Sequence, residues 1–239
     1  MEVLLRLGRA VDAFNHWTWP VPTLAIVLAV VVTAFIPPLR LAAIRAVDGL
    51  SRWTGLIATW LVLLAALVSA FNAAFRYSIG AILYIDTQLR VFGGGLGFLF
   101  DLYRNNSNSL RDVQLIMFAG MVMLGASWTL KMNEHVRVDL IYGSVGYRKR
   151  TWIDLIGGIL FLVPMCVTMI YFSWGWFLES WTGDEMSSNA GGLPRWPFKI
   201  FLPLGFALLL LQGLSEIFKC IAALTSNFQR EHAYEKPVQ

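Results

Sequence analysis

The sequence predicts an all-α fold, a polytopic bundle of membrane-spanning helices. Hydrophobic residues make up 57% of the 239-residue chain and charged residues only 14%, whereas soluble domains carry about 25% charged residues. The mean hydropathy is +0.60. Long runs without a single charge recur along the chain. Because lipid offers no hydrogen-bonding partners, such runs cross it as helices that pair their own backbone groups.

Four charge-free runs predict four core spans within a core region of residues 53–224. A helix of about 20 apolar residues crosses the hydrocarbon layer, and each run approaches or exceeds that length. Lys and Arg concentrate in the segment between the second and third runs, which predicts that this segment and the C-terminal tail, 225–239, are cytoplasmic. The predicted spans are residues 53–75, 113–131, 155–178 and 198–222.

A long periplasmic loop is predicted between the first two spans, over residues 76–112. The glycine-rich stretch 93–97 within it lacks the spacing and the lysine of a phosphate-binding loop, so it is interpreted as flexible connecting chain. The stretch 105–109 is interpreted as a polar turn before the second span.

The first 52 residues are predicted to form interfacial amphipathic helices around one extra apolar segment. Arg9-Ala10-Val11-Asp12 recurs as Arg45-Ala46-Val47-Asp48, and each copy leads into an apolar run. Residues 21–36 are solidly aliphatic, and Pro37-Pro38 then ends a helix. This segment could span the membrane, re-enter it, or be a signal peptide.

The residue types needed for catalysis or cofactor binding are missing from the predicted spans. None of His16, His135 and His232 lies within them, and the two cysteines are far apart. The sequence therefore predicts a protein that is not an enzyme, with no cofactor and no metal. Asp154 and Glu216 lie near helix ends, and the polar residues of the span interiors are neutral. We therefore expect helices without buried charges that could not carry a charged solute alone.

Small residues recur every fourth position in the first core span, at Ala65, Ser69 and Ala73. This spacing lets another helix approach closely. In the last span Gln212 and Glu216 share one helix face. The sequence leaves open whether the partner helices belong to this chain or to another subunit.

Three segments together resemble a known family. They are Asn133-Glu134-His135-Val136-Arg137-Val138-Asp139 after the second span, the run from Glu185 to Pro197, and Pro203-Leu204-Gly205-Phe206 with Gln212-Gly213 and Glu216. The chain resembles the small membrane subunit, DctQ-like, of tripartite ATP-independent periplasmic (TRAP) transporters. Within that family it looks most like the branch labelled for mannitol, chloroaromatic or 2-oxo-acid uptake.

The resemblance implies a non-catalytic subunit in the bacterial inner membrane. Its implied partners are a large DctM-like permease subunit, which it braces during an elevator motion, a periplasmic solute-binding protein, and membrane lipids. The resemblance also implies that the transporter imports an organic acid by secondary-active transport coupled to sodium. The alternative function is a membrane anchor of a redox or other enzyme complex. The candidate contact residues, each of which could instead be only structural, are His135, Arg137, Asp139, Asn189, Gly191, Gly192, Pro194, Trp196, Gln212 and Glu216.

Overall fold

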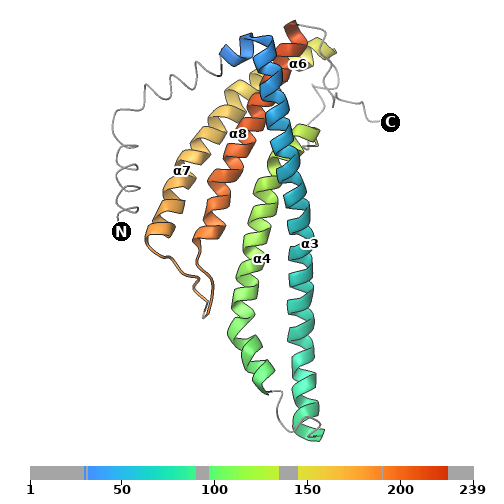
Figure 1. The fold of residues 1–239 in the computed structure, drawn as a ribbon, viewed down its shortest axis with the longest axis vertical. Helices are drawn as coiled ribbons and strands as arrows, with labels where there is room; N and C mark the ends of the chain where they lie inside the picture. The colour runs from blue at the N-terminus through green and yellow to red at the C-terminus, as the bar shows by residue number, and fades with distance from the viewer. Residues whose placement is uncertain (1–29, 31, 90–96, 135–144, 190, 226–239) are drawn as a thin grey trace. The chain divides into compact units, whose positions relative to one another are not determined.

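The computed structural model describes residues 30, 32–89, 97–134, 145–189 and 191–225. Over these residues the chain is helical apart from short turns and one isolated β-bridge, and the helices are drawn in Figure 1. The named elements are α3 (Pro37–Leu89), α4 (Gly97–Met132), α6 (Tyr147–Gly157), the π-helical turn η1 (Gly158–Leu162), α7 (Val163–Thr182) and α8 (Trp196–Thr225).

Four helical stretches in the described residues are long and apolar enough to cross a membrane. They are Pro37–Ile82, Asn106–Met132, Tyr147–Thr182 and Trp196–Thr225. Each contains most or all of one of the four predicted spans. The prediction of an all-α, polytopic membrane protein is therefore confirmed. The alternatives for the extra N-terminal segment fall mostly on residues 1–29 and 31, which lie outside the described residues.

The predicted loop at 76–112 is wrong over most of its length. α3 continues through Arg76 to Leu89, and α4 begins at Gly97. The predicted polar turn at 105–109 is helical as well. The prediction ended the spans at their flanking charges, but a charge does not interrupt backbone hydrogen bonding. Residues 76–89 and 97–112 contain no proline, so no residue there lacks the backbone N–H that a helix needs.

Local sequence explains where two of the helices begin and end. Pro37 is the first residue of α3, a position where its missing N–H has no helical partner to lose. α4 ends in a Schellman motif. Asn133 has a positive φ of 61°, its N–H donates to the Leu130 carbonyl, and the Glu134 N–H donates to the Thr129 carbonyl. Asparagine is one of the few residues that tolerates this backbone conformation.

One membrane-spanning stretch contains a π-helical turn. η1 lies between α6 and α7 and ends two residues before Pro164. Proline has no N–H and its ring crowds the preceding turn of an α-helix. A single π-helical turn is one of the local adjustments by which membrane helices absorb this disturbance.

The chain divides into two compact units. Unit 1 comprises Met1–Leu50, His135–Pro164 and Leu211–Gln239, and unit 2 comprises Ser51–Glu134 and Met165–Leu210. In unit 1, Leu155 of α6 packs against Ile217 and Cys220 of α8. A second apolar cluster there joins Phe218 of α8 to Ile44 of α3.

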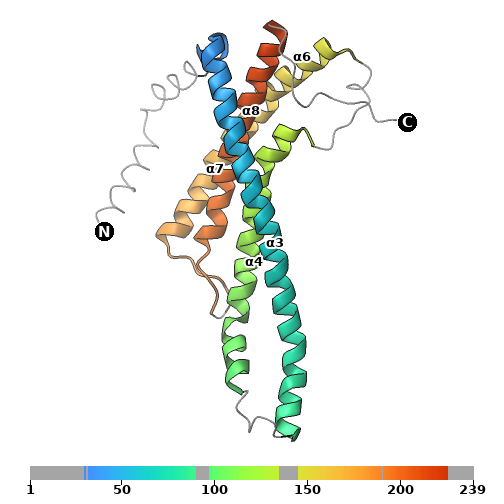
Figure 2. The ribbon, with the colours of Figure 1, turned by 45° about the vertical axis from the view of Figure 1, so that its right-hand side comes forward.

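Unit 2 is held by close helix packing and by short polar bonds. α3 and α4 run side by side in both views (Figures 1 and 2), and the Gln114 side chain of α4 donates to Ser69 of α3 at 3.2 Å. Ala65, one turn before Ser69, is fully buried, whereas Ala73 is exposed. The partner of the small-residue stripe around Ala65 and Ser69 therefore includes a helix of the same chain.

Candidate functional site

The segment between α7 and α8 is a short hairpin, residues 183–195, that we call the α7–α8 loop. The Ser187 N–H donates to the Leu193 carbonyl at 3.0 Å, and the Arg195 N–H donates to the Glu185 carbonyl at 2.8 Å. Met186 and Pro194 form an antiparallel bridge between these bonds. The hairpin therefore gives its side chains fixed positions, although it has no regular strand.

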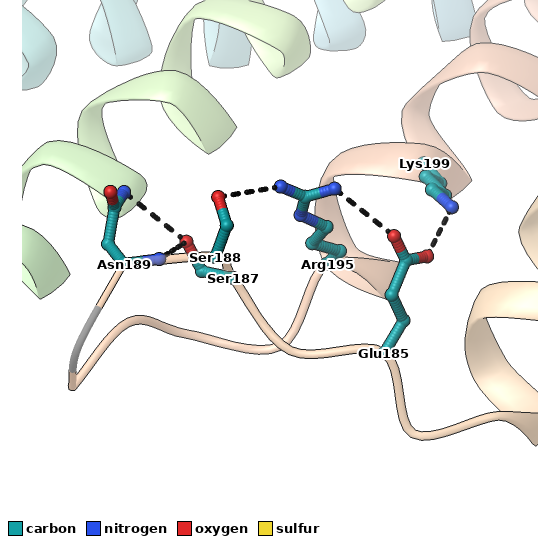
Figure 3. A network of polar contacts seen from close by, with 6 residues as sticks. All are labelled: Glu185, Ser187, Ser188, Asn189, Arg195 and Lys199. Carbon is teal, nitrogen blue, oxygen red and sulfur yellow. Dashed lines mark hydrogen bonds and ion pairs between the residues drawn. The ribbon is translucent and has the colours of Figure 1, made fainter.

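A charged network ties this hairpin to the first turn of α8 (Figure 3). Glu185 accepts from Arg195 at 3.2 Å and forms a second ion pair with Lys199. Arg195 also donates to the Ser188 hydroxyl at 3.3 Å. Lys199 is buried, and its ammonium lies 4.5 Å from the centre of the Trp176 ring. The hydrogen bond from Lys199 is the largest of the contacts that lower the pKa of Glu185 to about 2.

The α7–α8 loop is also anchored to α4 within unit 2. The Leu193 N–H donates to the buried carboxylate of Asp112 at 3.0 Å, and the Ser109 hydroxyl donates to the Gly191 carbonyl. Gly191 has a φ of 71°, a left-handed conformation that glycine adopts without strain. A Cβ on Gly192 would lie 2.7 Å from Oδ2 of Asp112, so only glycine fits there.

A second polar cluster lies in unit 1, between α3 and α8. Lys219 Nζ lies 2.9 Å from Oδ2 of Asp48 and 2.8 Å from Oε1 of Glu216. Gln212 donates to both carboxylates, at 3.1 Å and 3.0 Å, and the Ser215 hydroxyl donates to Asp48 at 3.1 Å. All five side chains are buried or half-buried.

The structure brings several predicted site residues together. Asn189, Gly191, Gly192 and Pro194 share the α7–α8 loop, and Asn189 donates to the Ser187 hydroxyl (Figure 3). Trp196 begins α8 and packs edge-to-face on Trp181, with 4.6 Å between the ring centres. Gln212 and Glu216 belong instead to the cluster in unit 1, where Gln212 is fully buried. His135, Arg137 and Asp139 lie outside the described residues.

The expectation of helices without buried charges is wrong. Arg40, Asp112 and Lys199 are all buried, and each lies within a described helix. Charges mark the ends of charge-free runs, but the runs themselves do not reveal which groups pair with those charges. A signal was present, because Asp112 and Lys199 directly precede charge-free runs, and a carboxylate or ammonium at such a boundary needs a partner.

We expect the Glu185 network to lose strength in acid. Its pKa lies well below the ordinary value of 4.5. The ionised carboxylate therefore stabilises the folded loop fully above pH 4.5, and this contribution falls away as the pH drops toward about 2. Thermal unfolding in detergent, followed by tryptophan fluorescence, should show a lower unfolding temperature over this window.

Two matched variants, Glu185→Gln and Glu179→Gln, isolate the role of the Glu185 carboxylate in this pH dependence. Glu185→Gln should remove its share of the pH dependence, whereas Glu179→Gln, an exposed carboxylate at the end of α7, should retain that share. The same pH profile for wild type and Glu185→Gln would contradict the assignment.

Comparison with known proteins supplies one match. The family model described as "Tripartite ATP-independent periplasmic transporters, DctQ component" matches residues 102–223, which is just over half of the chain. The match covers α4 after its first residues, α6, α7, the α7–α8 loop and nearly all of α8. No curated protein and no solved structure matches the chain.

Proposed function

Because the chain belongs to the DctQ family of tripartite ATP-independent periplasmic transporter components, we propose that it is the non-catalytic small permease subunit of a secondary-active importer. The family match carries this proposal. The transporter takes up an organic acid with sodium as the coupling ion, and a periplasmic solute-binding protein delivers the acid. The four helical stretches of the described residues that are long and apolar enough to cross a membrane agree with the small-subunit role.

The proposed membrane partner is a large DctM-like permease subunit. Within unit 2, α7 presents large apolar side chains that the described residues leave largely uncovered: Tyr171 is 61% exposed and Phe172 is 68% exposed. Lipid or another membrane subunit can cover such a surface. We propose that the large subunit covers part of it, so that this chain braces the fixed scaffold against which the elevator domain moves.

We further propose that the protein lies in the bacterial inner membrane with its C-terminus in the cytoplasm. Exposed Arg148 and Lys149 at the start of α6 favour a cytoplasmic position for that helix end. One continuous helical stretch, Tyr147–Thr182, is long and apolar enough to cross the membrane and leads to the α7–α8 loop. In this proposal the loop therefore lies in the periplasm. There the exposed parts of the loop can contact the solute-binding protein.

The predicted contact residues outside the α7–α8 loop fall into two groups in this proposal. His135, Arg137 and Asp139 are assigned to the cytoplasmic side, as contacts to the large subunit. Gln212 and Glu216 act through the intramolecular cluster that orders unit 1, since their hydrogen bonds go to side chains of the same chain.

Purification of the tagged chain from its native membrane, followed by an uptake assay, tests the proposal. A much larger polytopic protein should co-purify in about equal amount. Asn189→Lys should lower solute uptake without reducing this co-purification, whereas Thr182→Lys, an exposed control outside the hairpin, should leave both unchanged. Solute flux through the reconstituted chain alone would contradict the small-subunit role, and a haem absorbance band would favour a redox anchor.

A further inference from the structure

A groove of about 330 Å³ lies beside the α7–α8 loop, within unit 2. It is formed by the first turns of α8, by α7, by the loop and by the part of α4 that carries Asp112. The lining residues that matter for its chemistry are Arg111, Leu115, Ile116, Trp176, Phe198 and Lys199. The groove is open to its surroundings, so a ligand can enter it from the side.

The two halves of the groove differ in chemistry. Leu115 and Ile116 follow Arg111 by about one helical turn, and together with Phe198 they form an apolar wall. Lys199 directly precedes the charge-free run in α8, and Arg111 stands directly before Asp112, after which the charge-free run in α4 begins. Lys and Arg at such ends mark the level of the lipid headgroups. The cationic half therefore lies at headgroup level, and the apolar half extends toward the acyl chains.

The cationic half of the groove carries a net positive charge. Arg111, Arg195 and Lys199 outnumber the two nearby carboxylates, Asp112 and Glu185. Both carboxylates are already engaged, Glu185 by the two ion pairs and Asp112 by the Leu193 N–H.

Arg111 itself remains available to a ligand. Its side chain is exposed, and it forms no ion pair with any residue that the structure describes. Its guanidinium can therefore give paired N–H donors to a phosphate, the geometry in which arginine binds phosphate best.

We propose that this groove binds one anionic glycerophospholipid, with its phosphate at Arg111 and an acyl chain along Leu115, Ile116 and Phe198. A lipid with an ammonium headgroup is disfavoured because the three cations of the groove repel the ammonium. The inference rests on the membrane-spanning helices and not on the transport role, so it can fail or hold independently of the proposed function.

Native mass spectrometry of the full chain, purified with any partner that accompanies it, tests the inference. The complex is equilibrated with equal amounts of phosphatidylglycerol and phosphatidylethanolamine, and lipid adducts are read on this chain after its release in the gas phase. Both lipids carry the phosphate, but only phosphatidylethanolamine also carries an ammonium, which the net positive charge of the groove disfavours. We expect about fivefold enrichment of phosphatidylglycerol, which corresponds to about 1 kcal/mol for one net charge near the lipid headgroup.

Three variants separate the elements of the site. Arg111→Gln should abolish the enrichment, and Arg76→Gln, an exposed arginine outside the groove, should preserve it. Leu115→Trp should reduce adducts of both lipids by filling the groove. Because Arg111 is exposed, its variant is expected to fold, and the unfolding temperature checks this.

Several results would overturn the inference. They are equal retention of both lipids by the wild type, and the same enrichment in Arg111→Gln and Arg76→Gln. Displacement of the lipid by excess inorganic phosphate would reveal a site for small anions. A photo-crosslinker at position 115 that captures a protein in place of lipid would assign the groove to a subunit contact.

Discussion

Lys219→Met should destabilise unit 1 by about 3–5 kcal/mol, the cost of removing one partner from a buried ion pair. Among the residues that the structure describes, Lys219 is the cation that pairs with both Asp48 and Glu216, and its side chain is only 12% exposed. Methionine keeps the side-chain length but leaves two carboxylates facing each other. Chemical or thermal unfolding of the purified protein in detergent measures the loss.

The controls for this prediction lie in the same unit. Lys149→Met removes an exposed lysine of α6 and should change the stability little. The triple variant Lys219→Met, Asp48→Asn, Glu216→Gln removes the charges together and should recover most of the lost stability, because a neutral cluster leaves no unpaired ion. Equal stability of the Lys219 and Lys149 variants would show that the ion pairs contribute nothing.

Gly205→Ala should destabilise the contact between α8 and α4 in unit 2 by about 1–3 kcal/mol, the usual cost of overpacking. A Cβ at Gly205 would lie 2.5 Å from the Met123 Cβ and 2.9 Å from the Met123 carbonyl oxygen. The side chain of Met123 can move aside, but its backbone cannot move without separating the helices. The unfolding temperature in detergent, or resistance to sodium dodecyl sulfate, measures the effect.

Gly175 of α7 provides the matched control. A Cβ there meets no atom within 4 Å. Gly175→Ala should therefore be neutral or slightly stabilising, since alanine favours a helix more than glycine does. If the two alanine variants unfold alike, the close approach of α8 to α4 is not a determinant of stability.

The membrane helices could be predicted because hydrocarbon imposes a simple rule on the sequence. A run without charges that is long enough to cross the bilayer must be helical, and this rule located all four stretches. The rule says nothing about where a helix ends outside the hydrocarbon. For this reason the extensions of α3 beyond Arg76 and of α4 before Asp112 were missed, as both depend on uninterrupted backbone bonding.

Contacts between distant residues could not be read from the sequence. The pairing of Asp48 with Lys219 and the bond from Leu193 to Asp112 each depend on how helices from separate parts of the chain pack. The sequence indicates only that a charged side chain near a membrane span needs an ion-pair or hydrogen-bond partner, and not which residue provides it. The sequence drew attention to the α7–α8 loop through its Gly-Gly and proline residues. Glu185 was not among the predicted contact residues, because its contacts come from Arg195 and Lys199 around it.

The neighbouring glycines of the α7–α8 loop obey two different constraints. At Gly191 the restriction is angular, and an asparagine, which accepts a positive φ, satisfies it at modest cost. At Gly192 the restriction is volumetric, because Asp112 and Ser187 already occupy the space of a first side-chain carbon. Glycine is therefore favoured at the first position for its backbone angle and required at the second for its lack of a side chain. Asparagine should be tolerated at Gly191 better than any side chain at Gly192.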